Sequence, residues 1–160
     1  MEPLSRIRPA SQEDATHIAA LVTEAYSPYI ARIGKKPAPM LDDYRQVIAE
    51  SSVFVLASGA EIQGVLVLSQ ENTELLLNNI AVAARYKGQG IGKRLLAFCE
   101  DYAQRMGCTT IKLYTHERMT ENIAIYKRLG YVETHRAMEE GYARVFMRKT
   151  LETASEQTKQ

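Results

Sequence analysis

Apolar and polar positions alternate along the chain in two distinct periods. The clearest helical period covers residues 90–106, where apolar side chains recur every three or four positions for more than four turns. Gly107 provides a natural C-terminal stop. A second helix is predicted after Ser11 and Asp14, which form a capping signal. The buried stripes should consist of Ile91, Leu95, Phe98, Cys99, Tyr102 and Met106 in the long helix, and Ala15, Ile18, Val22 and Ala25 in the first.

Strand-forming residues gather in seven short segments, at residues 5–9, 53–57, 62–68, 75–82, 109–114, 131–134 and 143–148. Shorter helices are predicted from residue 41 or 42 to 50 and over residues 120–129. Residues 27–40 hold three prolines, too many for a regular helix or a central strand, and predict an irregular lid or binding loop. The order βααβββαβαββ indicates one parallel crossover within a mixed sheet.

The segment at residues 75–82 is almost wholly apolar, as expected of a strand covered on both faces. Asn78 and Asn79 interrupt it. Two polar residues inside a central strand require an explanation.

Composition narrows the class of protein. The chain has 160 residues, 46% hydrophobic and 24% charged, with a formal net charge of +1. We expect one domain over residues 1–151 and a disordered polar tail over residues 152–160. The balanced charge argues against a nucleic-acid partner, and no apolar run suffices to cross a membrane. Two cysteines outside any CxxC pair and three scattered histidines favour a cytoplasmic protein without a metal site.

The candidate chemistry lies at residues 87–93, Lys-Gly-Gln-Gly-Ile-Gly-Lys, between the apolar strand and the long helix. Glycines at alternate positions allow a tight turn, and the helix N-terminus adds free N–H groups and a positive dipole end, which suits a phosphate. The P-loop pattern fails because Arg94 follows Lys93, and the dinucleotide pattern fails because Lys93 replaces its third glycine. The same glycines would also serve a turn that binds nothing.

Two segments resemble the GNAT superfamily of N-acetyltransferases. Asn79-Ile80-Ala81-Val82 with the glycine loop and the following helix is similar to the family's acetyl-CoA-binding core. The family signature [QR]xxGx[GA] is matched by Lys87, Gly90 and Gly92, with lysine in place of glutamine or arginine. Residues 122–131 resemble the family's second region, a helix ending in tyrosine followed by Leu-Gly-aromatic. The resemblance covers about residues 5–149 and implies an α+β fold, a mixed sheet of six to seven strands flanked by four helices.

This resemblance implies roles for the residues that match. The CoA pyrophosphate would be held by the loop, through the backbone of Gln89, Gly90, Ile91, Gly92 and Lys93, with Gly88 allowing the turn and Lys87 adding charge. The pantetheine arm would pair with backbone groups of Ile80 and Val82, on either side of Ala81. A bulge in this strand opens the slot in the family, and Asn78 and Asn79 would mark it, either with or without contact between their side chains and the ligand. Many members place a CoA-contacting asparagine where this chain has Met119; Asn122 is a substitute for it or a helix cap.

Catalytic roles follow from the same likeness. Tyr126 matches the tyrosine that protonates the departing CoA thiolate in many members, although a core aromatic would look the same. Glu74 is the candidate general base, His116 is a further one, and a solvated glutamate with a water relay is the alternative. The acceptor would lie against Tyr29, Arg32, Tyr44 and Tyr142. Arg32 with Lys35 and Lys36 favours an acceptor bearing a carboxylate or phosphate, or is only a solvated face.

We therefore expect an acetyl-CoA-dependent N-acetyltransferase that transfers its acetyl group directly to a primary amine, with no metal. The alternatives are a transferase for another acyl chain or acceptor, a non-catalytic CoA-binding or sensing module, and a nucleotide-binding protein. The acceptor is left open, and so is the oligomeric state, because family members are often homodimers but no residue identifies an interface.

Overall fold

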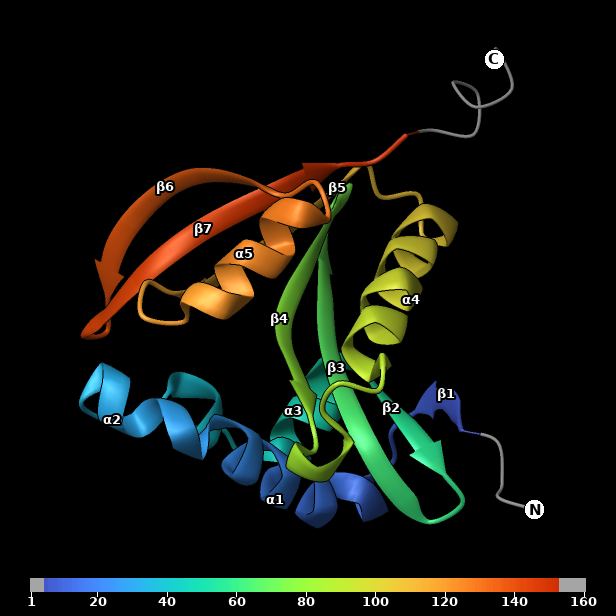
Figure 1. Cartoon of the computed structure of the whole chain (residues 1–160). Helices are drawn as coiled ribbons and strands as arrows, with labels where there is room; N and C mark the ends of the chain where they lie inside the picture. The colour runs from blue at the N-terminus through green and yellow to red at the C-terminus, as the bar shows by residue number, and fades with distance from the viewer. Residues whose placement is uncertain (1–4, 153–160) are drawn as a thin grey trace. The chain divides into compact units, whose positions relative to one another are not determined.

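A computed structural model describes residues 5–152 of the protein. Seven strands form one sheet in the order β1-β2-β3-β4-β5-β7-β6 (Figure 1). The pairs β1–β2, β2–β3, β5–β7 and β6–β7 are antiparallel, and the parallel pairing of β4 with β5 is the predicted crossover. The strands are β1 Arg6–Pro9, β2 Ser52–Ser58, β3 Glu61–Glu71, β4 Glu74–Val82, β5 Thr110–His116, β6 Val132–Glu139 and β7 Tyr142–Thr150.

Four helices of seven or more residues accompany the sheet, together with a four-residue helix and short 3-10 turns. They are α1 Ala15–Tyr26, α3 Tyr44–Glu50, α4 Ile91–Arg105 and α5 Thr120–Arg128, and the four-residue helix is α2 Ile30–Ile33. The predicted fold class is therefore confirmed. Most of the predicted tail, residues 153–160, lies outside the described residues.

The chain divides into two compact units. The first unit contains the residues up to Ser69 and residues 78–98, and the second contains residues 70–77 and those from Cys99 onward. The backbone thus passes from one unit to the other three times. The prediction of a single domain stays a prediction, and each unit is described by itself below.

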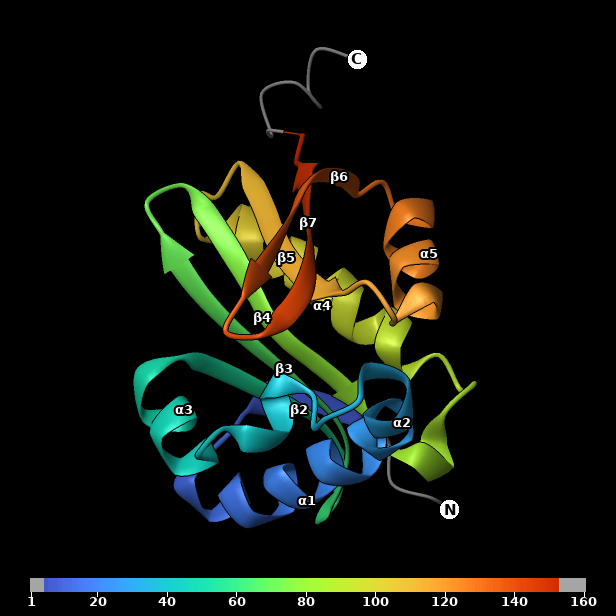
Figure 2. The same cartoon turned by 90° about the vertical axis from the view of Figure 1, so that its left-hand side faces the viewer.

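The first unit has a core between α1 and its strands. Ile18 and Val22 of α1 are fully buried, as are Val55 of β2 and Val65 of β3. All four residues of the predicted α1 stripe are buried, which confirms that prediction. Helices α1 and α3 lie side by side (Figure 2). Burial of these aliphatic side chains is the main force that holds the unit together.

The start of α1 follows the predicted capping signal with one refinement. The Ser11 N–H donates to the Asp14 carboxylate at 2.8 Å. Residues Gln12–Asp14 form a 3-10 turn, so the α-helix begins at Ala15. Asp14 also accepts from both terminal nitrogens of Arg8, at 2.8 and 3.0 Å. This hydrogen-bonded ion pair lowers the pKa of Asp14 to about 2.

The prediction of irregular structure for residues 27–40 is wrong in part. This segment forms three short helical pieces, Ser27–Tyr29, α2 and Ala38–Leu41. Pro28 and Pro39 are the second residues of their turns, where the backbone N–H has no acceptor inside the turn, so its absence breaks no bond of that turn. Helix α3 starts later than predicted, because Asp43 caps it by accepting from the Arg45 N–H at 3.1 Å.

Helix α4 matches the predicted long helix closely. Ile91, Leu95 and Cys99 are buried, and Gly107 ends the helix with φ 75°. Met106 was expected in the buried stripe, but it follows the last helical residue and is 47% exposed. Within the first unit, a Cβ on Gly64 of β3 would lie 2.9 Å from side-chain atoms of Ile91 and Leu95, so the helix approaches β3 closely.

The second unit is dominated by a long β6–β7 hairpin that curves strongly (Figure 1). The strand expected at residues 131–134 extends instead from Val132 to Glu139. Its turn is built from Glu140 and Gly141, both with positive φ, the conformation that two-residue hairpin turns require. Strand β5 likewise continues two residues past its predicted end, so His116 is its last residue rather than a loop residue.

Candidate functional site

Two glycines shape the loop that leads into α4. Gly88 and Gly90 both adopt φ 80°, and a Cβ on either would meet nothing within 4 Å. The expectation of three turn-forming glycines needs correction at Gly92. That residue lies in the first turn of α4, where a Cβ would make an ordinary 3.7 Å contact with Val82. Residues 87–90 are exposed, so the loop backbone is open to solvent.

The N-terminus of α4 can hold an anion. The first ladder hydrogen bond runs from the Arg94 N–H to the Gly90 carbonyl at 3.0 Å. The N–H groups of Ile91, Gly92 and Lys93 precede that bond, so they have no acceptor inside the helix. The helix dipole adds partial positive charge at the same place. Lys87 and Lys93 are exposed on either side of this turn and carry full charges.

The strand before the loop is half open, contrary to the expectation of a strand covered on both faces. Ala81 is buried in the core of the first unit, whereas its neighbours Ile80 and Val82 are only partly buried. The parallel pairing with β5 runs from Glu74 opposite Thr110 to Leu77 opposite Leu113. The backbone of the last β4 residues is therefore the candidate for pairing with an extended ligand.

Asn79 is a buried polar residue in this strand, with 6% of its surface exposed. Its side-chain oxygen accepts from the Tyr26 hydroxyl at 2.6 Å, and its amide nitrogen donates to the Tyr44 hydroxyl oxygen at 3.1 Å. The exposed Asn78 donates to the Ser69 hydroxyl at 2.9 Å. Internal hydrogen bonds thus account for both polar residues, while the proposed bulge stays a prediction.

Tyr126 lies on α5 in the second unit and is 7% exposed. Its ring meets that of Tyr131 nearly edge to face, with 5.6 Å between centroids. Its carbonyl accepts from the N–H groups of Leu129 and Tyr131, which closes the helix end. The catalytic role assigned to Tyr126 by resemblance stays a prediction.

Asn122 does not cap α5. Met119 is the N-cap residue, and Asn122 lies in the first helical turn with its amide nitrogen 3.8 Å from the Met119 sulfur. Its role toward CoA is a prediction that rests on resemblance alone.

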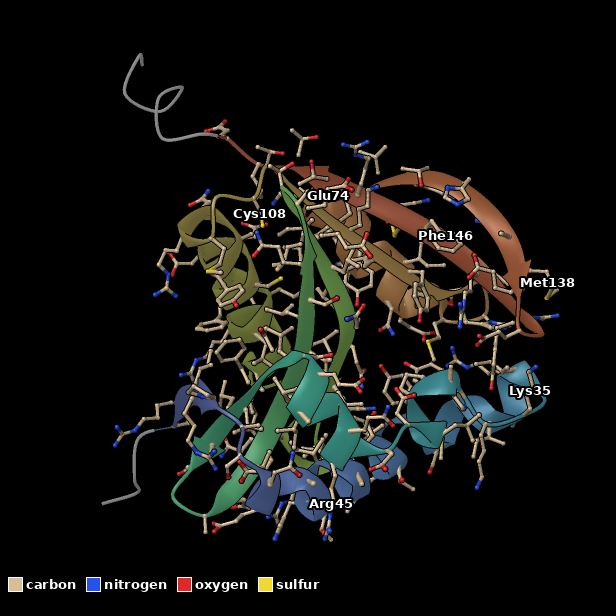
Figure 3. The ribbon with its side chains drawn as sticks, turned by 180° about the vertical axis from the view of Figure 1, so that it is seen from behind. Lys35, Arg45, Glu74, Cys108, Met138 and Phe146 are labelled. Atoms are coloured by element: carbon tan, nitrogen blue, oxygen red, sulfur yellow. The ribbon has the colours of Figure 1, made fainter. Side chains whose placement is uncertain are left out.

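Glu74 is the first residue of β4 and forms an ion pair with Lys112 at 2.8 Å. Figure 3 shows it close to Cys108, in keeping with the hydrogen bond from the Thr109 N–H to the Thr73 carbonyl at 2.8 Å. The structure therefore gives Glu74 an ion-pair partner, and its role as the general base stays a prediction.

His116 has its Nδ1 engaged. That nitrogen accepts from the Arg118 N–H at 3.0 Å, so in the neutral ring the proton is on Nε2. The lone pair that a general base needs is therefore already used in this arrangement. The role of His116 as a further candidate base stays a prediction.

The four predicted acceptor residues lie in different surroundings. In the first unit, the guanidinium of Arg32 stands 5.2 Å from the centroid of the Tyr29 ring. Tyr44 is buried, with its hydroxyl donating to the Pro39 carbonyl at 2.7 Å, so it belongs to the core rather than to a lining. In the second unit, Tyr142 is buried at the start of β7, and the His116 ring meets it edge-on.

Sequence reasoning missed Arg144, two residues after Tyr142 on β7. It is 8% exposed, donates to Glu139 at 2.8 Å and stands 4.2 Å above the Tyr114 ring. Strand alternation offered a signal, because Tyr142, Arg144 and Phe146 share one face.

Over residues 5–152, no helix is long and apolar enough to span a membrane, and no group of three or more His, Cys, Asp or Glu is arranged to hold a metal.

The comparison with protein families decides the class. The profile of the acetyltransferase (GNAT) family matches residues 18–131, which include β4, the glycine loop, α4 and α5. The chain belongs to the GNAT family of acetyltransferases.

Curated relatives agree with the GNAT assignment over part of their length. "Probable N-acetyltransferase 14" of Xenopus tropicalis is 33% identical over 66 residues, which are 41% of this chain and 32% of that protein. "N-acetyltransferase family 8 member 2" of Rattus norvegicus is 26% identical over 92 residues, 54% of this chain and 41% of the rat protein. The chain thus spans well under half of either relative.

Solved GNAT structures share the fold over nearly the whole chain. The ribosomal-protein-S18-alanine N-acetyltransferase of Escherichia coli superimposes with a TM-score of 0.76 at 18% identity, covering 94% of this chain and 96% of that one. The PaiA N-acetyltransferase of Thermoplasma acidophilum, solved in complex with coenzyme A, gives 0.75 at 17% identity, with 92% and 99% covered. At such identities the likeness shows the fold alone.

Proposed function

We propose that this GNAT protein is an acetyl-CoA-dependent N-acetyltransferase that transfers acetyl directly to a primary amine. The observation that carries the proposal is the loop of residues 87–93. Two glycines with positive φ expose its backbone, and it leads straight into the N-terminus of α4. Such a turn favours a phosphate, and CoA carries a pyrophosphate.

Two parts of the cofactor have candidate partners in the first unit. The pyrophosphate would lie on the N–H groups of residues 89–93, with Lys87 and Lys93 supplying charge. The space above Gly88 and Gly90, where a side chain would begin, holds no other protein atom within 4 Å, which is what close approach of a ligand to the backbone needs. The pantetheine arm would pair with the backbone of Ile80 and Val82, the half-open stretch of β4.

The chemistry needs few protein groups. The neutral amine attacks the thioester carbonyl and a C–N bond forms, and the nitrogen then gives its extra proton to water. The C–S bond breaks as CoA leaves as a thiolate. Tyr126 is the proposed acid that gives its proton to that sulfur, and its phenolate takes a proton back from water. Tyr126 is buried, and a proton donor in a site shielded from water acts more strongly than an exposed one.

Calorimetric titration with acetyl-CoA, with ATP and NAD as controls, tests the cofactor. We expect selective binding of acetyl-CoA, and Gly90→Asp should weaken it by at least ~30-fold, about 2 kcal/mol, through steric clash and charge repulsion at the phosphate site. Gly107→Asp is the matched control, because Gly107 also has positive φ and open space but stands at the other end of α4. Unchanged affinity in a folded Gly90→Asp protein would remove the loop from the binding site.

Tyr126→Phe tests the proposed acid. Turnover with an amine panel, followed by thiol release, should fall by ~10²-fold or more while the Kd for acetyl-CoA stays within about twofold. An unchanged rate under conditions where chemistry limits turnover would exclude Tyr126 from the mechanism. Binding of acetyl-CoA without turnover of any amine would favour a CoA-binding module instead.

A further inference from the structure

Asn79 stands at the centre of a buried chain of hydrogen bonds in the first unit. Tyr26 donates to Asn79 at 2.6 Å, Asn79 donates to Tyr44 at 3.1 Å, and Tyr44 donates to the Pro39 carbonyl at 2.7 Å. None of these bonds belongs to the backbone ladder of a strand or helix. They join residues that are 53, 35 and 5 positions apart in the sequence.

The direction of every bond in the chain is determined. The Pro39 carbonyl can only accept, so the Tyr44 hydroxyl must donate to it, and its oxygen is then left to accept from the Asn79 amide. The Asn79 oxygen in turn accepts from Tyr26. Burial raises the pKa of Tyr44, with the nearby Asp42 charge adding to the shift, so its hydroxyl stays protonated at neutral pH. A chain with one consistent direction strengthens each of its bonds.

The two tyrosines mark the ends of one segment. Tyr26 is the last residue of α1, and Tyr44 is the first residue of α3. Residues 27–43 between them include Tyr29 and Arg32, two of the proposed acceptor residues, and Pro39, which closes the chain. Both ends of this segment are therefore tied to a single side chain on β4.

The other end of the chain reaches the strand proposed to hold the pantetheine arm. The Tyr26 hydroxyl lies 3.2 Å from the Ile80 carbonyl as well as 2.6 Å from Asn79. Because a hydroxyl has one proton, the shorter bond to Asn79 takes most of it. A shift of the backbone at Ile80 would thus move Asn79 and Tyr26 together.

We propose that Tyr26, Asn79 and Tyr44 are positioning residues that link the β4 backbone at Ile80 to residues 27–43, so that acetyl-CoA on β4 orders the acceptor segment. This inference rests on the proposed function, because it needs acetyl-CoA to bind that strand. It predicts that the two substrates are coupled through the protein: the acyl donor prepares the segment that receives the amine. Such coupling requires no direct contact between the two ligands.

Hydrogen–deuterium exchange on the full chain, with and without acetyl-CoA, tests the link. In the wild type, acetyl-CoA should slow amide exchange about threefold or more in peptides covering residues 87–93 and also in those covering residues 27–43. Tyr44→Phe should keep the protection at residues 87–93 and lose it at residues 27–43, with the Kd for acetyl-CoA changed less than about threefold. Tyr29→Phe is the control, since it removes a hydroxyl from the same segment but none of the three bonds.

The possible outcomes separate the two claims. Equal protection of residues 27–43 in wild type and Tyr44→Phe would overturn the inference, as would protection confined to residues 87–93 in the wild type. Absence of protection at residues 87–93 in the wild type would refute the proposed cofactor, and the inference with it. If Tyr44→Phe does not fold, Tyr26→Phe breaks the chain at its half-buried end and is expected to behave in the same way.

Discussion

Two buried polar groups, one in each unit, have opposite hydrogen-bonding environments. In the first unit, Asn79 uses its amide oxygen and nitrogen, and the Tyr44 hydroxyl both donates and accepts. In the second unit, the Tyr131 hydroxyl is buried and has no hydrogen-bond partner among the described residues. A paired buried group holds its neighbours in one arrangement, whereas an unpaired one only costs desolvation free energy. Similar burial therefore implies different consequences of mutation.

The largest expected effect comes from removing Asn79, the buried group whose amide oxygen and nitrogen are both paired. Asn79→Leu removes two hydrogen bonds and leaves the Tyr26 and Tyr44 hydroxyls without their shared partner, so the free energy of unfolding should fall by about 2–3 kcal/mol. Urea titration measures it. Asn78→Leu, the exposed neighbour with a single bond to Ser69, is the control and should cost less than about 1 kcal/mol. Equal losses in the free energy of unfolding at positions 79 and 78 would show that burial of the Asn79 amide does not add to its contribution.

A charged pair in the first unit should give a smaller effect with a clear pH window. The pKa of Asp14 is lowered from 3.8 to about 2 by Arg8, so its contribution is fully present above pH 4 and disappears as pH falls toward 2. Asp14→Asn should therefore be less stable than wild type by about 1–2 kcal/mol at pH 5, after allowing for solvent screening at the partly exposed Arg8. Denaturation series at pH 5 and pH 2 should show this difference shrinking toward zero. If the stability difference between wild type and Asp14→Asn did not change with pH, the negative charge of Asp14 would not be the source of the stabilisation.

The smallest effect belongs to the unpaired hydroxyl of the second unit. Tyr131→Phe removes a buried group without breaking a described hydrogen bond, so the free energy of unfolding should stay the same or rise by up to about 1 kcal/mol. The same substitution at Tyr44 should lower it by about 1–2 kcal/mol. Thermal and urea unfolding of both variants makes the comparison direct. If Tyr131→Phe lowered the free energy of unfolding as much as Tyr44→Phe, the contrast between the unpaired and the paired hydroxyl would be wrong.

The sequence predicted elements whose pattern is local. Helix α4 has a stripe of strong period, and the β2–β3 hairpin has its turn residues between two apolar runs, so both were found close to their true limits. Strand β6 was predicted only over its first residues because most of its positions are exposed on both faces, which leaves no alternation to recognise. Residues 27–40 were misread because Pro28 and Pro39 lie early in short helical turns rather than preventing them.

In the candidate site too, features set by local sequence were predicted, and features set by distant residues were not. Gly88 and Gly90 were expected to turn the backbone, and their positive φ confirms it, because the property belongs to the residues themselves. The reason for Asn79 could not be found in the sequence, since its partners stand 53 and 35 residues away. Arg144 was missed for a related reason: its partners Tyr114 and Glu139 become neighbours only when β5 and β6 both pair with β7.

The three passages of the backbone between the units also set an order of events during synthesis. Residues 70–77 leave the ribosome before residues 78–98, yet they belong to the unit whose other members start at Cys99. The first unit in turn cannot be completed until Phe98 has emerged. At roughly 5–20 residues per second, the half-buried Tyr26 waits several seconds for Asn79 to be made. Its hydroxyl must remain in water until β4 arrives, so the tie between α1 and β4 closes late, after the helices that it joins have been synthesised.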